Sequence, residues 1–260
     1  MGMMHIRNPQ SGIRNRASLP MSVHGIIVAA GQGRRLGGAQ PKAWVPLVGQ
    51  PMLVWTCRAL AEWPNWTSWV IVYPPYTSTA AREAIACRFT PPCRTQWVAG
   101  GPERTDSVRL GIRALADQPD DAVVLIHDAA RPNVSPALIQ RVVATIAQGS
   151  VAVVPVVPVT DTIKSVTDTG QVEYTLDRRH LVAVQTPQAF RLGVLRTAFA
   201  RAGNAGTFPD DAALVEHAGY PVDTVEGDRW NVKITYPEDL PVAAYLIRKR
   251  WQWTEAGEPE

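Results

Sequence analysis

A glycine-rich stretch near residue 30 contains the residue types that bind phosphate. An apolar run ends in residues 29–33, AAGQG, two arginines follow, and a short loop ends in Pro41-Lys42. Small residues let backbone N–H groups approach phosphate oxygens closely. The pattern differs from a dinucleotide fingerprint and lacks the Walker spacing GxxxxGK[ST]. Arginines fixed beside such a loop favour a nucleoside triphosphate as the ligand, and an ordinary strand–helix turn with solvated arginines is the alternative.

Two further charged residues are associated with apolar runs. Asp128 lies in HDAARP, directly after the run 122–126, and Lys233 lies between Val232 and Ile234. Ligands of α/β proteins bind at the carboxyl ends of strands, where a carboxylate holds Mg²⁺ or a ribose hydroxyl. An inward-pointing lysine between apolar residues needs an anionic partner. The alternatives are a capping role for Asp128 and an outward-facing position for Lys233.

Apolar, β-branched runs alternate with helical patterns along the chain, and these elements must position the charged residues. Because most of these runs are apolar throughout, they predict strands that are covered on both faces. We therefore predict an α/β fold with a single doubly wound, mostly parallel sheet. The predicted strands are 25–29, 69–73, 95–98, 122–126, 151–157, 222–225 and 232–235, and the predicted helices are 51–63, 104–116, 135–147 and 237–250.

Residues 160–186 interrupt this alternation. Two β-like runs flank Asp168-Thr169-Gly170, a sequence typical of a hairpin turn. Such a polar hairpin has little to bury against its own sheet, so we predict a protruding β-hairpin arm. The arm either meets a partner subunit or closes over a substrate, and we favour the partner.

Composition and charge limit the class of protein. A chain of 260 residues with 46% hydrophobic and 19% charged residues buries a sizeable core and is not disordered. The richest apolar stretch, 151–159, is too short for a membrane helix, so we expect no membrane partner. The net charge of +3 comes from residues 1–22, which contain three arginines and no acid. The near-neutral remainder argues against a nucleic-acid partner.

We expect one folded domain over residues 23–250, with a disordered leader at 1–22 and a tail at 251–260. A transit peptide is an alternative for the leader, and Met21 is an alternative start. Three cysteines without CxxC spacing indicate neither a zinc site nor a disulfide framework. Since no targeting signal is evident, we expect a cytoplasmic location.

Several motifs in a fixed order resemble one family. They are AAGQGRRLG with PK (29–42), GGPERTDSVRLGI (100–112), HDAARP (127–132), PVTDTIK (158–164), TLDRRHL (175–181), QTPQAF (185–190) and NVKITYPEDL (231–240). Across residues 24–246 the chain resembles the 2-C-methyl-D-erythritol 4-phosphate cytidylyltransferases of the non-mevalonate isoprenoid pathway. The resemblance implies a Rossmann-like nucleotidyltransferase fold. It also implies transfer of CMP from CTP to the sugar phosphate with Mg²⁺ as cofactor and release of pyrophosphate.

The resemblance also implies roles for individual residues. The catalytic cations would be Arg35, Lys42 and Lys233, and Asp128 would be the metal ligand. The nucleotide-binding positions would be Ala29, Ala30, Gly31, Gly33, Gly101, Ser107 and Asp128. The sugar-phosphate positions would be Thr162, Arg178, Thr186, Arg131 and Lys233. In the family the arm crosses a homodimer, so Arg178 would reach the partner's site, and Arg179 is its rival for that role.

One position departs from the family pattern. Many relatives carry Asp where this chain has Pro102, which offers neither a backbone donor nor a carboxylate. Contacts to the base or ribose at this point must therefore come from neighbouring residues. Two other functions remain as alternatives: a cytidylyltransferase for another alditol phosphate, such as ribitol 5-phosphate, and a non-catalytic nucleotide-binding protein.

Overall fold

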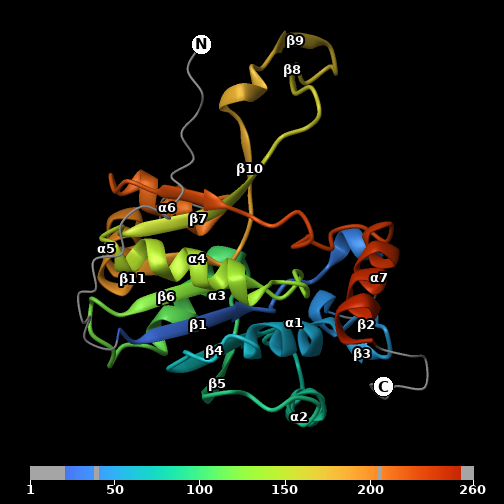
Figure 1. Cartoon of the computed structure of the whole chain (residues 1–260), viewed down its shortest axis with the longest axis vertical. Coiled ribbons are helices and arrows are strands. Elements are labelled where there is room, and N and C mark those ends of the chain that lie inside the picture. Colours follow the sequence, from blue (N-terminus) through green and yellow to red (C-terminus); the bar gives the residue numbers. More distant parts are fainter. Residues whose placement is uncertain (1–20, 38–40, 204–206, 253–260) are drawn as a thin grey trace.

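The computed structural model describes residues 21–37, 41–203 and 207–252, and an eight-stranded sheet forms its centre (Figure 1). The strands β5, β4, β1 and β6 lie side by side and parallel, and β12 is parallel to β7. Two strands reverse direction, since β11 is antiparallel to β6 and β7 and β10 is antiparallel to β7. The predicted mostly parallel sheet is therefore confirmed. The strands are β1 (Val23–Val28), β4 (Ser68–Tyr73), β5 (Arg94–Ala99), β6 (Val123–Asp128), β7 (Ala152–Pro158), β10 (Val182–Val184), β11 (Gln188–Arg191) and β12 (Asp223–Glu226).

Helices cover both faces of the sheet, as the apolar strands require. Along β1, Ile27 packs in one core with α1 and α4, and Ile26 packs in a second core with α3, α5 and α6. This alternation follows from the two-residue period of a strand. A smaller core joins α7 to α1 and to the short hairpin of β2 (Pro46–Leu47) and β3 (Gln50–Pro51). The helices are α1 (Met52–Ala61), α2 (Thr79–Ala86), α3 (Arg104–Arg113), α4 (Pro136–Ala147), α5 (Leu192–Ala202), α6 (Asp211–His217) and α7 (Asp239–Trp251).

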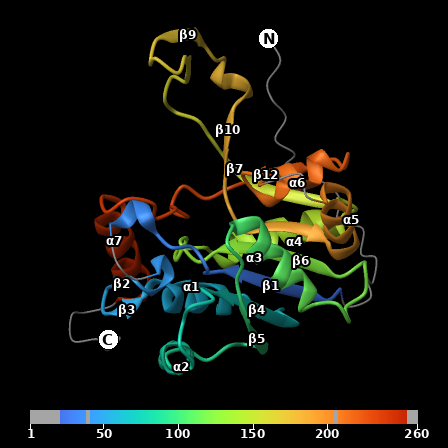
Figure 2. The ribbon, with the colours of Figure 1, turned by 180° about the vertical axis from the view of Figure 1, so that it is seen from behind.

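A β-hairpin projects from the body, as predicted for residues 160–186 (Figures 1 and 2). It consists of β8 (Lys164–Val166) and β9 (Val172–Thr175), which pair in antiparallel fashion. Gly170 in its turn has φ +82°, a backbone conformation that glycine adopts without strain. Val166, Val172 and Tyr174 are more than half exposed on this arm. The hairpin therefore presents apolar side chains that the described part of its own chain leaves uncovered.

The prediction of a strand at residues 232–235 is wrong. The segment lies outside the sheet, and its buried Ile234 donates its backbone N–H to the Ala130 carbonyl, at 2.9 Å. Ile234 is apolar because it packs in the small core with α7, so a strand-like pattern arose from burial alone. Helices α2, α5 and α6 were not predicted.

The boundaries of the folded body also extend slightly beyond the predicted 23–250. Met21 packs against the core and the Ser22 carbonyl accepts the Val123 N–H, so the body includes two residues assigned to the leader. Trp251, assigned to the tail, is the last residue of α7 and contacts Trp55 with ring centroids 5.2 Å apart. The rest of the predicted leader and tail, residues 1–20 and 253–260, lies outside the described residues. Within the described ranges no helix has the length and apolar character to cross a membrane.

Candidate active site

A cavity of about 340 Å³ opens at the carboxyl ends of β1 and β6. The chain leaves β1 toward β4 and β5, and then returns to the other side of β1 with β6. Ligands of α/β sheets bind where the strand order reverses in this way. The cavity is lined by the loop after β1, the loop after β4, the start of α3, the end of β6 and the segment around Lys233.

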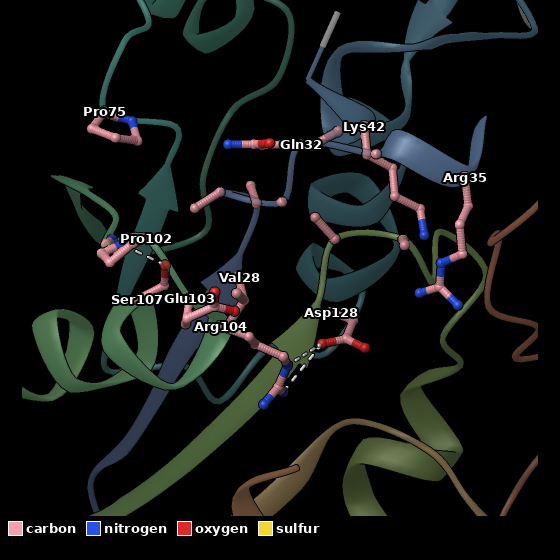
Figure 3. A pocket seen from close by; sticks show the side chains of 18 of the residues that line it. Val28, Gln32, Arg35, Lys42, Pro75, Pro102, Glu103, Arg104, Ser107 and Asp128 are labelled. Atoms are coloured by element: carbon pink, nitrogen blue, oxygen red, sulfur yellow. Dashed lines mark hydrogen bonds and ion pairs between the residues drawn. The ribbon is translucent and has the colours of Figure 1, made fainter. Parts of the chain in front are cut away.

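The glycine-rich loop holds Lys42 at the cavity. The Lys42 N–H donates to the Gly31 carbonyl at 3.2 Å, which folds the loop back on itself. Gly33 has φ +69°, and a Cβ there would lie 2.8 Å from the Lys42 Cβ. Glycine is therefore required at residue 33 by both its backbone conformation and its packing. Figure 3 shows that Lys42 and Arg35 extend in the same direction, toward the side of the cavity where Asp128 lies.

Lys42 is half-buried among other cations. Burial, and then the nearby charges of Lys233 and Arg35, lower the pKa of Lys42 from 10.5 to about 8, although Asp128 opposes this shift. The charged form of Lys42 is thus disfavoured in the free protein. A bound anion would reverse the imbalance, so the cavity is suited to a highly charged anionic ligand.

Asp128 is the carboxylate that pairs with Lys233 and Arg104. Its Oδ2 lies 2.7 Å from the Lys233 Nζ, and its Oδ1 lies 3.2 Å from both Nε and Nη2 of Arg104. Burial raises the pKa of Asp128, but the charges of Arg104, Lys233 and Arg131 outweigh it and hold the pKa well below its usual range. Asp128 is therefore ionised at any physiological pH.

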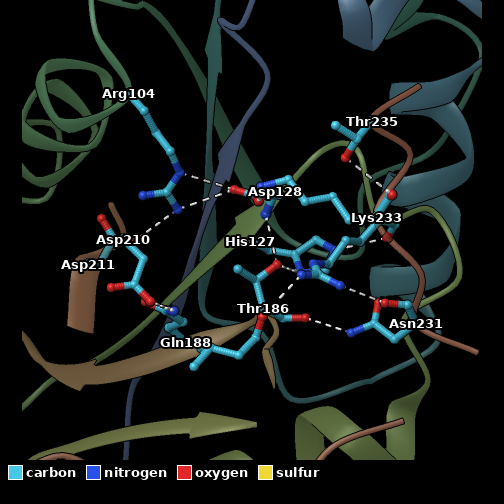
Figure 4. Close-up of polar contacts among 12 residues, drawn as sticks. Arg104, His127, Asp128, Thr186, Gln188, Asp210, Asp211, Asn231, Lys233 and Thr235 are labelled. Carbon is cyan, nitrogen blue, oxygen red and sulfur yellow. Dashed lines mark hydrogen bonds and ion pairs between the residues drawn. The ribbon is translucent and has the colours of Figure 1, made fainter. Parts of the chain in front are cut away.

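Sequence reasoning missed Arg104, which binds two buried carboxylates. Besides Asp128 it contacts Asp211, with 2.8 Å between Nη2 and Oδ2 (Figure 4). The signal was present in the motif GGPERTDSV, because Arg104 opens α3 three residues after Gly101, which lines the cavity. Asp211 gave no such signal, since it comes from a helix that was not predicted.

A second hollow of about 240 Å³ adjoins the cavity and shares Arg104, Asp128 and Lys233 with it. Arg131 lines it and is 8% exposed; it donates to the carbonyls of Asn231 and Val184 at 2.7 and 3.3 Å. Its buried Nε has no hydrogen-bond partner among the described residues. A buried donor without a partner is costly and marks a place where a ligand oxygen would bind.

Thr186 and His127 fix the backbone beneath this hollow. The Arg131 carbonyl only accepts, so the neutral His127 donates to it from Nε2 at 3.0 Å, and Nδ1 accepts from the Thr186 hydroxyl at 3.0 Å. The Thr186 Oγ1 in turn accepts the Asp128 N–H at 3.1 Å. Burial lowers the pKa of His127 to about 4, which keeps the ring neutral. The neutral His127 is therefore linked to the Asp128 backbone through Thr186.

The structure brings most of the predicted site residues together. The cavity is lined by Ala29, Ala30, Gly31, Gly33, Arg35, Lys42, Gly101, Ser107, Asp128 and Lys233, and the adjoining hollow is lined by Arg131 and Thr186. Figure 3 shows Pro102 and Ser107 across the cavity from Lys42. Pro102 lines the cavity beside Gly101, whose N–H donates to the Ser107 Oγ at 3.1 Å.

Two predicted residues lie apart from the others. Thr162 and Arg178 are exposed on the arm and line neither the cavity nor the adjoining hollow of their own chain. Arg178 donates to the Thr160 carbonyl, so it is folded against the base of the arm. Its rival Arg179 pairs with Asp177, 2.6 Å away.

The lowered pKa of Lys42 leads to a prediction for stability. At pH 7 the folded state carries a disfavoured charge, so Lys42→Met should raise the free energy of unfolding by about 1 kcal/mol, a value reduced for partial exposure to solvent. The unfolded chain keeps this proton up to its ordinary pKa of 10.5, whereas the folded protein releases it near 8. Between pH 8 and 10.5 the free energy of unfolding of wild type therefore rises relative to that of the variant.

Urea unfolding of both proteins at pH 7 and pH 10 measures this difference, with the exposed Lys249→Met as the control. The difference in free energy of unfolding between Lys42→Met and wild type should be smaller at pH 10 than at pH 7. A difference of the same size at both pH values would contradict the lowered pKa of Lys42.

Comparison with known proteins agrees with this geometry. Residues 23–249 match the family model of 2-C-methyl-D-erythritol 4-phosphate cytidylyltransferase. An enzyme of that name from Saccharopolyspora erythraea is 45% identical over 229 residues, covering 87% of this chain and 100% of the relative. Another enzyme of that name from Nocardia farcinica is 45% identical over 237 residues, covering 91% of this chain and 98% of the relative.

A solved structure gives the same result. The crystal structure of 2-C-methyl-D-erythritol 4-phosphate cytidylyltransferase from Thermus thermophilus superposes with a TM-score of 0.70 at 33% identity, covering 88% of this chain and 100% of that one. The family match spans the sheet, the cavity and the arm described above. The chain therefore belongs to the 2-C-methyl-D-erythritol 4-phosphate cytidylyltransferase family.

Proposed function

We propose that the chain transfers CMP from CTP to 2-C-methyl-D-erythritol 4-phosphate, giving 4-diphosphocytidyl-2-C-methyl-D-erythritol and pyrophosphate. The observation that carries this proposal is the convergence of Arg35, Lys42, Arg104 and Lys233 on one cavity, where Arg104 and Lys233 pair with Asp128. Four cations at one cavity are suited to a substrate with several phosphate groups. The family membership supports the choice of CTP and the sugar phosphate.

The two sides of the cavity are suited to the two ends of CTP. Lys42 and Arg35 would bind the triphosphate against the glycine-rich loop, and the base would lie near Gly101 and Ser107. The Ser107 hydroxyl accepts the Gly101 N–H, so its own hydrogen is free to donate to a base acceptor such as cytosine O2. Because Pro102 has no N–H, it adds only apolar contact there.

The adjoining hollow would hold the sugar phosphate. Arg131 with its unpartnered Nε, Thr186 and Lys233 are placed to bind its polar groups. A phosphate oxygen of the substrate attacks the α-phosphorus of CTP, and the bond from that phosphorus to the bridging oxygen of the β-phosphate breaks. Pyrophosphate leaves with the electron pair, and Lys42 and Arg35 stabilise the negative charge that develops on it.

Asp128 would hold Mg²⁺ together with the nucleotide phosphates. In the part of the chain that the structure describes, no three His, Cys, Asp or Glu side chains gather to hold a metal by themselves. Mg²⁺ does not need such a cage, because one carboxylate and substrate phosphates usually bind it. The ionised Asp128 at the cavity fits this requirement. When bound, Mg²⁺ supplies charge neutralisation at the phosphates.

We further propose a homodimer in which the arm of one chain completes the site of the other. The exposed apolar side chains Val166, Val172 and Tyr174 support a partner for the arm. Thr162 and Arg178 are far from their own cavity and would bind the sugar phosphate in the partner's site. A guanidinium binds a phosphate dianion through two parallel hydrogen bonds.

The substrate assignment is tested by pyrophosphate release from CTP with a panel of alditol phosphates. With Mg²⁺ present, we expect turnover with 2-C-methyl-D-erythritol 4-phosphate and little with ribitol 5-phosphate. The reverse preference would replace this function by that of another alditol phosphate cytidylyltransferase. Tight CTP binding without turnover on any acceptor would indicate a non-catalytic nucleotide-binding protein.

The shared site is tested by mixing two inactive variants. Lys42→Ala and Arg178→Ala should each lose roughly a hundredfold or more in kcat, since each removes a cation that contacts phosphate. In a mixed dimer one site collects both defects and the other has neither. Random exchange in an equal mixture gives about half mixed dimers, so roughly a quarter of wild-type activity should return. A mixture that stays inactive after verified subunit exchange would rule out the arrangement.

A further inference from the structure

Arg104 lies between two buried carboxylates that come from distant parts of the sequence. Its Nη2 is 2.8 Å from the Asp211 Oδ2, and its Nε and Nη2 are each 3.2 Å from the Asp128 Oδ1. Asp211 is 3% exposed and Asp128 is 7% exposed. The proposed reaction uses Asp128, but it assigns no role to Asp211.

The position of Asp211 is fixed by contacts to the sheet. The next residue, Ala212, donates its N–H to the Gln188 Oε1 at 3.1 Å. The Gln188 Nε2 donates to the Asp210 Oδ2 at 2.8 Å, and Gln188 belongs to β11 (Figure 4). The start of α6 is therefore tied to the strand beside β6, which ends in Asp128. Both carboxylates that hold Arg104 stand on one rigid part of the molecule.

The two cations on Asp128 differ in one respect. Lys233 occupies Oδ2 at 2.7 Å, and Asp128 is its only ion-pair partner within the described residues. Arg104 occupies Oδ1 and has Asp211 as a second partner. A divalent cation needs an oxygen of Asp128, so it must weaken at least one of these ion pairs. Only Arg104 keeps a carboxylate partner when its contact with Asp128 weakens.

We propose that Asp211 is a positioning residue, which holds Arg104 and shares its charge so that Asp128 can accept a divalent cation together with the nucleotide. The identity of that nucleotide rests on the function proposed above. Asp211 acts through Arg104 and touches neither substrate nor metal. Its effect should therefore appear in the coupling between metal and nucleotide and not in nucleotide binding alone.

The charges give Asp211→Asn an effect with opposite signs in two conditions. Without Asp211, the charge of Arg104 has Asp128 as its only carboxylate partner, so that ion pair becomes stronger and competes with Mg²⁺. The site also becomes more positive by one unit, which repels the metal and attracts the free triphosphate. The affinity for CTP in EDTA should stay equal or rise, whereas the gain in affinity on adding Mg²⁺ should fall.

Calorimetric titration of the full chain with CTP, in EDTA and in excess Mg²⁺, measures both quantities. We expect Asp211→Asn to reduce the Mg²⁺-dependent gain on the order of tenfold, a typical size for coupling between two sites. Glu216→Gln is the matched control, because it removes the same charge from an exposed position on the same helix. It should behave as wild type, and Asp211→Glu should recover most of the gain.

Arg104→Gln provides a second variant that does not depend on the folding of Asp211→Asn. It frees the Asp128 Oδ1 and removes a cation, so it should show the reverse pattern: weaker CTP binding in EDTA, with a gain from Mg²⁺ at or above that of wild type. The double variant Arg104→Gln/Asp211→Asn should then show nearly the same Mg²⁺-dependent gain in CTP affinity as Arg104→Gln alone, since Asp211 acts through Arg104.

Three results would overturn the proposal. If Mg²⁺ increased the CTP affinity of Asp211→Asn as much as that of wild type, Asp211 would have no positioning role. An equal loss of affinity with and without Mg²⁺ would show that Asp211 only supports the fold. A reduced gain in Arg104→Gln would contradict the competition between Arg104 and the metal. Failure of wild type to bind CTP under either condition would instead overturn the proposed function itself.

Discussion

The site depends on one ion cluster, in which several cations are held around the buried carboxylate Asp128. Lys233 and Arg104 each pair with one of its oxygens, and burial, followed by the nearby charge of Lys233, lowers the pKa of Lys42. Positively charged side chains repel one another, so they stay this close only because the packing of the surrounding elements fixes their positions. The cluster keeps the cavity ready for a polyanion, and the binding of that polyanion removes the repulsion that the free protein carries.

The sheet accounts for the rigidity of this cluster. Asp128 ends β6 and its N–H is bound by Thr186, which precedes β11, while the glycine-rich loop follows the adjacent β1. Asp128 therefore lies at a strand end and Arg104 at the start of α3, whereas Lys233 lies outside the sheet, in a segment held by the hydrogen bond from the Ile234 N–H to the Ala130 carbonyl. The arm is the exception, because its hairpin projects from the body and carries Arg178 away from the cavity of its own chain (Figure 2). In the proposed homodimer, Arg178 would come to this site from a second chain.

The sequence predicted most strands of the sheet, the central helices, the hairpin and about half of the residues that line the cavity, but it missed β11. These features depend on local signals: apolar runs, a glycine-rich turn, and the position of Asp128 after a strand. The strand predicted at 232–235 was wrong because Ile234 is buried against α7 without joining the sheet. Asp211 was missed because its pairing with Arg104 joins residues 107 positions apart, which no local pattern encodes. The roles assigned to individual residues remain predictions.

The central claim is that the cation cluster lacks an anion that the nucleotide supplies, and proton uptake tests it most directly. CTP binding is measured by calorimetry at pH 8 in buffers with different ionisation enthalpies. Lys42, with a pKa of about 8 in the free protein, should take up about half a proton when the bound triphosphate raises that pKa. Lys42→Arg, which stays charged, should take up none. Uptake that is absent in wild type, or equal in the two proteins, would contradict the account.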